Sequence, residues 1–310
     1  MTTPTHILLR ALLPEHTVIR LSPDEVRAQT ADGSDVTVWW FRTPQQARTV
    51  VTALEALNGK QAIPLMRAAD IAGRITTRPA VIVNSPAGVP FHSIIDRLTT
   101  QQLHTLGRQF GHLVADIHQH PALHYGPLAA PGFISQQALL LHRVNEACTR
   151  LCDAGILSTH RADTLRDIIA TTFTDETAPA CLVHGALAPE HLWIERSGQH
   201  FTIAAITGWN AAFGGRPAAD HVRIADAFSA DALFSLRIGY GEVYDERCQR
   251  PADQLRERVL LPERLVWTLS RAGHAASHAQ PDEAARLLTI VHRWCDAIHQ
   301  SADPTEEEEK

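Results

Sequence analysis

The stretch that most constrains the fold is residues 181–213, where two apolar runs flank a short polar segment. Residues 191–195, His-Leu-Trp-Ile-Glu, have the composition of a β-strand, and residues 201–206 form a second such run. Between them, residues 196–199, Arg-Ser-Gly-Gln, have the composition of a turn. The pattern predicts a β-hairpin. The loops that precede and follow a hairpin lie at the same end, so their side chains are expected to form one site.

The loops on either side of this hairpin carry His184, Gly185, Leu187 and Trp209. With these residues the loops resemble the catalytic segment of the aminoglycoside phosphotransferase and choline kinase-like family. The family pattern is His-Gly-Asp-Leu, three variable residues and Asn, followed by a strand that ends in Ile-Asp-Trp or Ile-Asp-Phe. His184, Gly185, Leu187 and Trp209 keep this frame, and Asp220 ends a segment similar to the family's Gly-Asp-Pro-Ala-Tyr-Asp. The resemblance implies an α+β, bilobal protein kinase-like fold, with a small antiparallel β-sheet lobe and a larger, mainly helical lobe.

Three positions that carry chemistry in the family differ here. Ala186 stands at the position of the catalytic Asp, while His191 and Gly208 stand at those of the metal-binding Asn and Asp. Alanine cannot accept a proton, glycine has no side-chain ligand, and magnesium prefers oxygen ligands to an imidazole. The resemblance therefore implies a site with no catalytic residue and no metal.

The small lobe lacks the family's phosphate-binding groups as well. Aligning the Asp32-Gly33 turn with the corresponding turn of the family places Trp39 at the lysine position and Val50 at that of its partner acid. The first lysine of the chain is Lys60, and residues 18–26, with a turn expected at Pro23-Asp24, contain no glycine that would form a phosphate cradle. An indole at position 39 is expected to fill the cleft between the lobes.

The family residues that remain look architectural. His184, Gly185 and Asp220 correspond to positions that brace the catalytic loop in the family. They are expected to keep the shape of the loop without its chemistry.

The leading hypothesis is a catalytically inactive phosphotransferase-fold protein, or pseudokinase, that acts as a binding or regulatory module for an unidentified protein partner or small ligand. No cofactor is expected in that case. One alternative is a small-molecule phosphotransferase of the antibiotic, choline or sugar kinase type with non-standard catalytic residues, for which Glu190 or Asp226 could supply a base. Another is a nucleotide-binding sensor without turnover. Only these alternatives call for Mg-ATP.

The domain organisation follows from the same frame. Residues 1–84 are expected to form the small β-rich lobe, 85–90 the linker, 91–302 the helical lobe with the degenerate hairpin segment 181–213, and 303–310 a disordered acidic tail. Strands are expected at 17–21, 25–30, 36–41, 63–66 and 80–83, and helices at 43–57, 135–153, 158–173, 219–240, 251–272 and 281–300, with a further helix capped at Thr99 or Thr100.

Composition excludes several other functions. The net charge of −6 lies mostly in the tail, so no basic nucleic-acid surface is expected. No apolar run is long enough for a membrane span, and the N-terminus lacks a signal-peptide pattern, so a cytoplasmic location without membrane insertion is expected. The five cysteines and eighteen histidines show no metal-binding spacing.

Overall fold

The computed structural model describes residues 4–13, 16–21, 26–172, 179–248 and 257–301. The turn expected at Pro23-Asp24 and the acidic tail 303–310 lie outside these residues. None of the helices in the described part is long and apolar enough to cross a membrane.

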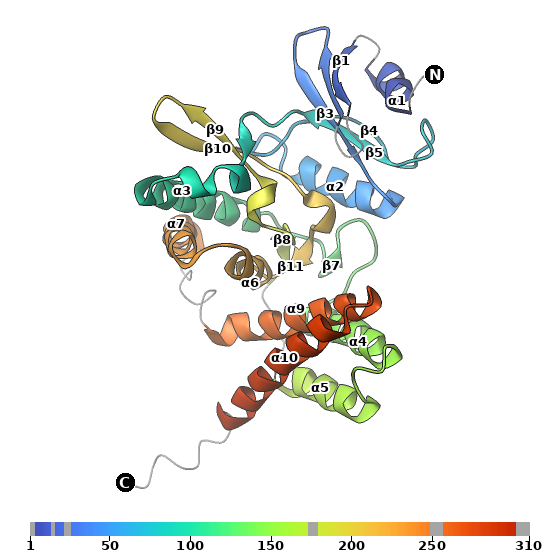
Figure 1. Cartoon of the computed structure of the whole chain (residues 1–310), viewed down its shortest axis with the longest axis vertical. Helices are drawn as coiled ribbons and strands as arrows, with labels where there is room; N and C mark the ends of the chain where they lie inside the picture. The colour runs from blue at the N-terminus through green and yellow to red at the C-terminus, as the bar shows by residue number, and fades with distance from the viewer. Residues whose placement is uncertain (1–3, 14–15, 22–25, 173–178, 249–256, 302–310) are drawn as a thin grey trace.

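The N-terminal part is a five-stranded antiparallel sheet of order β1-β2-β3-β5-β4, with a helix on each face (Figure 1). Side chains alternate between the two faces of a strand. Thus Val36 and Val38 of β3 pack with α1, whereas Trp39 belongs to the apolar cluster that contains α2. The elements are α1 (Pro4–Leu12), β1 (His16–Leu21), β2 (Val26–Thr30), β3 (Asp35–Trp40), α2 (Pro44–Ala56), β4 (Met66–Asp70) and β5 (Ala80–Asn84).

Helix α2 begins where its sequence predicts. The side chain of Thr43 accepts a hydrogen bond from the backbone of Gln46, and the Gln46 side chain accepts one from the backbone of Thr43. This reciprocal capping satisfies two backbone donors that a helix start otherwise leaves unpaired.

The prediction of a strand at 63–66 is wrong. Strand β4 begins only at Met66 and continues to Asp70, antiparallel to β5. Pro64 has no backbone N–H and cannot donate to a sheet ladder, so the apolar run around it is a poor strand in spite of its hydrophobicity.

The C-terminal part is mainly helical, and its helices form two groups. Helix α3 packs along α7, while α4, α5, α9 and α10 share a separate apolar cluster at the far end of the molecule (Figure 1). The helices are α3 (Thr100–His118), α4 (Gln136–Asp153), α5 (Thr159–Thr172), α6 (Ala218–Ala227), α7 (Ala230–Cys248), α9 (Glu257–Ser277) and α10 (Pro281–Ser301).

The structure has two helices, α6 and α7, where the sequence predicts a single helix at 219–240. The chain between residues 219 and 240 breaks at Phe228, which has an extended backbone with φ of −117° and ψ of 153°. The next residue, Ser229, accepts a hydrogen bond on its hydroxyl from the backbone of Ala232 and so caps α7. The break allows α6 and α7 to run in different directions.

The predicted hairpin is present. Strand β9 (Leu192–Ser197) pairs antiparallel with β10 (His200–Ile206). The expected linker segment 85–90 contributes strand β6 (Val89–Pro90), which pairs with β9. A second small sheet, of order β7-β11-β8, joins Gly126–Pro127, Phe213–Gly215 and Cys181–Val183.

The hairpin also contacts the N-terminal part directly. The backbone N–H of Ile206 donates to the carbonyl of Ala62 at 2.8 Å. The guanidinium of Arg27 on β2 lies 5.3 Å from the ring centroid of Trp193 on β9. The hairpin therefore lies where the two parts of the chain meet.

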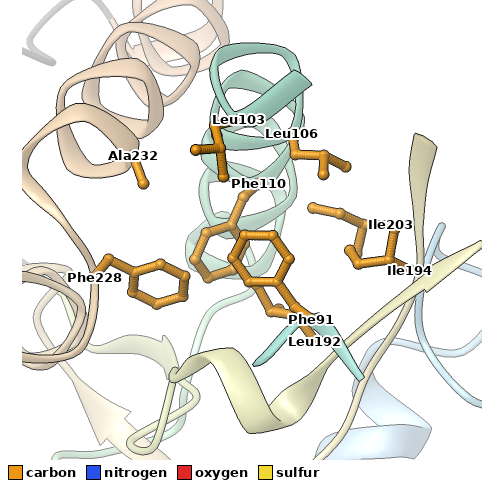
Figure 2. A pocket seen from close by; sticks show the side chains of 10 residues that line it. Phe91, Leu103, Leu106, Phe110, Leu192, Ile194, Ile203, Phe228 and Ala232 are labelled. Atoms are coloured by element: carbon orange, nitrogen blue, oxygen red, sulfur yellow. The ribbon is translucent and has the colours of Figure 1, made fainter. Parts of the chain in front are cut away.

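Behind the hairpin, aromatic and aliphatic side chains from α3, β9 and β10 fill the space up to the start of α7 (Figure 2). Phe228 lies 5.4 Å from Phe110 and 6.2 Å from Phe91, measured between ring centroids. The cavity that remains is only ≈ 10 Å³. This is roughly enough for one water molecule and too small for an organic ligand.

Candidate functional site

The loop that follows β8 is fixed by a buried carboxylate on the first turn of α6. Asp220 accepts hydrogen bonds from the backbone N–H groups of His184 and Gly185, at 2.9 and 2.8 Å. Gly185 has a φ of +80°, and a Cβ there would overlap the carbonyl oxygen of Ala211. Only glycine fits this close approach without displacing the backbone.

His184 is held in one neutral tautomer. Its Nε2–H donates to the carbonyl of Thr207 at 2.8 Å, and its Nδ1 accepts from the backbone N–H of Ala186 at 3.2 Å. Burial lowers the pKa of His184 to about 4, although the nearby Asp220 opposes this shift. The ring also packs on the buried indole of Trp209, with 4.4 Å between centroids. His184 thus ties the loop before the hairpin to the loop after it.

Asp220 belongs to a larger buried network. Nε2 of His118 on α3 lies 3.1 Å from its carboxylate, and Nδ1 of His118 lies 3.1 Å from the hydroxyl of Tyr240 on α7. Burial alone would raise the pKa of Asp220, but the hydrogen bond from His118 and the electrostatic interactions with His118, His184 and Arg223 outweigh it and lower the pKa to about 2. A buried charged carboxylate is thereby kept satisfied by three donors.

His191 and Gly208, the two expected metal positions, fill one another's space. Gly208 has a φ of +87°, and a Cβ added to it would lie 2.6–2.7 Å from three atoms of the His191 ring. The imidazole therefore occupies the volume into which a side chain at position 208 would extend. Burial lowers the pKa of His191, which favours the uncharged ring.

The alanine at the expected base position and the two acids named as alternative bases have different surroundings. Ala186 is half-buried and offers no side-chain acceptor, and Glu190 is exposed. Asp226 lies in the last turn of α6. Its carboxylate accepts from Nε1 of Trp267 and from Arg271, at 2.8 and 3.1 Å, and so serves the contact with α9.

The two small-lobe positions lie on the same face of the sheet. Trp39 is half-buried and packs against the apolar cluster that includes Val50 of α2 and Trp209 of the hairpin loop. Trp40 faces the other way, toward the cluster with α1. The side chain at the expected lysine position is therefore an indole in apolar surroundings.

These residues do not fit a magnesium ion. Magnesium needs a near-octahedral shell that is mostly oxygen, with one or two carboxylates. The two expected metal positions hold the imidazole of His191 and a glycine, Gly208. The imidazole fills the space that a ligating side chain at position 208 would need. Among the described residues no group of three or more His, Cys, Asp or Glu side chains is arranged to hold any metal ion.

The comparisons with known proteins give a clear result for the fold. A provisionally assigned aminoglycoside phosphotransferase from Ralstonia eutropha JMP134 has a TM-score of 0.65 at 14% identity, covering 96% of this chain and 98% of that one. A provisionally assigned fructosamine-3-kinase from Thermobifida fusca YX-ER1 has a TM-score of 0.60 at 18% identity, covering 91% and 97%. No protein-family model matches the sequence, and the search of curated proteins finds no match.

A third similar structure is a thermostable variant of aminoglycoside phosphotransferase APH(4)-Ia in a ternary complex with ADP and hygromycin B. Its TM-score is 0.58 at 12% identity, covering 96% of this chain and 98% of that one. The chain thus has the bilobal α+β kinase-like fold of these phosphotransferases, and the resemblance inferred from the sequence is confirmed at the level of fold.

The sequence motif locates the loop but not the groups that support it. No motif in the sequence marks His118, whose ring binds Asp220. Nothing in the sequence points to Tyr240 as a partner for either residue. No local pattern connects these three positions, since each lies on a different helix and only the fold brings them together.

Proposed function

We propose that this protein is a catalytically inactive member of the phosphotransferase fold, which acts as a binding module for a small ligand or a protein partner. The observation that carries the proposal is the imidazole of His191 over Gly208. In phosphoryl transfer most of the rate comes from positioning the phosphates and neutralising their charge, largely through bound magnesium. A ring in the metal position and an alanine in the base position support neither task.

The small lobe supports the same proposal. A nucleotide would have to place its phosphates near the half-buried indole of Trp39, which has one hydrogen-bond donor and no charge. An unpaired buried charge is strongly unfavourable. Trp39 instead packs in the cluster of Trp209 and Val50, which suits a closed contact between the lobes.

The experiment is a paired measurement of nucleotide binding and turnover on the full chain. Isothermal titration with ATP and magnesium should give no heat of binding at physiological concentrations. Phosphate release should equal that of buffer, with and without aminoglycosides, choline or sugars. Turnover that is lost in Glu190→Gln but kept in Asp226→Asn would overturn the proposal and identify a relocated base.

A different outcome would distinguish a nucleotide sensor from an inactive binding module. Micromolar ATP binding without turnover, weakened when Trp39 is replaced by alanine, would contradict an inactive cleft filled by indole and favour a sensor.

A further inference from the structure

A polar cavity of ≈ 220 Å³ lies in the helical part of the chain, between α4, α6 and α9. These three helices lie close together in the lower half of Figure 1, away from β9 and β10. The charged residues that line the cavity are three arginines and two glutamates, namely Arg143, Arg150, Arg223, Glu146 and Glu263.

Two of the arginines are set against aromatic rings. The guanidinium carbon of Arg143 lies 4.1 Å from the ring centroid of Phe213, and that of Arg223 lies 5.3 Å from the same centroid. Arg223 is also 4.5 Å from the ring of Trp267, which lines the cavity. Stacking on rings fixes the planes of both guanidinium groups while leaving their N–H donors available.

Those donors are only partly used. Arg223 donates one hydrogen bond, from Nη1 to the carbonyl of Ala219 at 2.8 Å, and its buried Nε finds no partner within the described part of the chain. Arg143 stacks on Phe213 without a hydrogen bond to any described residue. A buried guanidinium with unfilled donors is costly unless something supplies acceptors.

The charges around the cavity also indicate that the two arginines lack acceptors. Glu263 is 3% exposed and accepts from Nε2 of Gln136 at 2.9 Å, but among the described residues it forms no ion pair with either arginine. Burial lowers the pKa of Arg143 to about 10, and the neighbouring Arg223 lowers it further, although Glu263 opposes both. Two half-buried arginines of like charge therefore face one cavity, and neither forms an ion pair with a described residue.

We propose that this cavity binds the phosphate or carboxylate group of a small anionic ligand through the guanidinium groups of Arg143 and Arg223. Oxyanions of this kind fit the paired donors of a guanidinium, and the charge of the ligand would compensate both arginines. A groove of ≈ 480 Å³ shares Arg150 and Trp267 with the cavity, and it can hold the rest of the ligand.

This inference goes beyond the proposed function, because it concerns a different place in the fold. The cavity is lined by α4, α6 and α9, whereas His191 and Gly208 lie in the loops beside the hairpin of β9 and β10. The ligand is an anion, and the site needs neither a nucleotide nor a metal ion. Either proposal can therefore fail without the other.

Inorganic phosphate and succinate serve as probes, titrated into the full chain at constant ionic strength with sodium chloride. Trp267 supplies the reporter, since its indole N–H donates to Asp226 and its ring lines the cavity. The indole NMR signal, assigned with a Trp267→Phe variant, should shift in a saturable way with at least one probe. The probe that binds more tightly identifies the head group.

Arg143→Gln and Arg223→Gln should each weaken that binding at least tenfold, whereas Arg161→Gln, an exposed arginine on α5, should leave it unchanged. Arg143→Lys keeps the positive charge but loses the paired N–H donors of the guanidinium, so this variant should bind the probe more weakly than the unaltered protein. It tests the proposal even if a glutamine variant fails to fold. No saturable shift with either probe, or an equal shift with sodium chloride alone, would overturn the proposal.

The variants also keep the two proposals distinguishable. ATP carries phosphates of its own and could enter this cavity. ATP binding that disappears in Arg143→Gln is capture of the phosphates here and supports the anion site. ATP binding that persists in Arg143→Gln lies elsewhere and counts against the inactive cleft.

Discussion

The imidazole of His191 occupies the space into which a side chain on Gly208 would extend, so that a Cβ at position 208 would be 2.6–2.7 Å from Cγ, Nδ1 and Cε1 of the ring. The backbone holds the pair together, because the N–H of Thr207 donates to the carbonyl of His191 at 2.8 Å. The two residues thus act as one unit. The larger side chain at position 191 requires the smallest one at position 208.

Gly208→Asp should therefore destabilise the protein by about 2–4 kcal/mol, through overlap with the ring and a left-handed backbone. Adding His191→Asn removes the overlap, so the double variant should recover about 1–2 kcal/mol relative to the sum of the single changes. Urea unfolding of the four proteins in this cycle measures the coupling.

Gly198 provides the matched control for the backbone term. It has a φ of +64° in the hairpin turn, and no atom lies within 4 Å of the point that a Cβ would occupy there. Gly198→Asp should destabilise the protein by only about 1 kcal/mol, through the left-handed conformation alone. Equal losses for Gly198→Asp and Gly208→Asp, with no coupling to position 191, would show that the ring does not fill the site.

Asp220 should be the most sensitive acid of the loop. Asp220→Asn keeps the shape but loses the charge, and its amide places donors against the N–H groups of His184 and Gly185. Breaking a buried charged network in this way should cost about 3–5 kcal/mol. Asp163→Asn, which removes an exposed ion pair with Arg166, should cost at most about 1 kcal/mol. Similar losses in the two variants would contradict the bracing role of Asp220.

Local sequence signals predicted the elements whose causes are local. The capping residues Thr43 and Thr99, with Gln46 and Gln102 three positions later, determine where α2 and α3 begin, and both helices begin there. Turn composition likewise located the hairpin. The error at β4 came from weighting hydrophobicity above the missing N–H of Pro64. The missed break between α6 and α7 had a signal, the cap at Ser229.

The candidate site was only half predictable for a different reason. The motif identified Ala186, His191 and Gly208 as the positions that depart from the family. It could not indicate that the ring of His191 turns toward Gly208, because that orientation depends on the packing of the loops after β8 and β10. The shared stacking of Arg143 and Arg223 on Phe213 is likewise a property of the tertiary structure.

Stability should fall as the pH is lowered from neutrality. The folded-state pKa of His184 is lowered from 6.5 to about 4 and that of His221 to about 3, in both cases mainly by burial. Between these values and 6.5 the unfolded chain binds more protons than the folded one, so protonation favours unfolding. The stability is fully present above pH 6.5 and is lost through this window, by roughly 3 kcal/mol for His184.

Asp220 extends the loss to lower pH. Its folded-state pKa of about 2 lies below the ordinary value of 3.8, so its contribution to stability is present above pH 3.8 and disappears as the pH falls toward 2.

Urea unfolding at pH 7, 5.5 and 4.5 measures the loss of stability that the two buried histidines are expected to cause. His184→Gln should flatten the curve there, and an unchanged slope in that variant would rule out His184 as its source.

The last prediction concerns His221, a buried residue whose two ring nitrogens have no hydrogen-bond partner within the described structure. Its ring packs edge-on against Tyr240, with 4.3 Å between centroids. Two unsatisfied polar atoms in the core are unfavourable, and an apolar ring of similar shape avoids that cost. His221→Phe should therefore raise the free energy of unfolding at pH 7 by about 1 kcal/mol, with a small loss from the larger ring.

The pH dependence distinguishes this explanation from a simple gain in packing. Removing His221 also removes a group that is neutral when folded and charged when unfolded at acid pH. The advantage of His221→Phe over the unaltered protein should therefore grow between pH 6.5 and 4.5. His274→Phe, at an exposed position of α9, should show no such growth. An advantage for His221→Phe that is the same at both pH values would mean that this histidine is not buried in its neutral form.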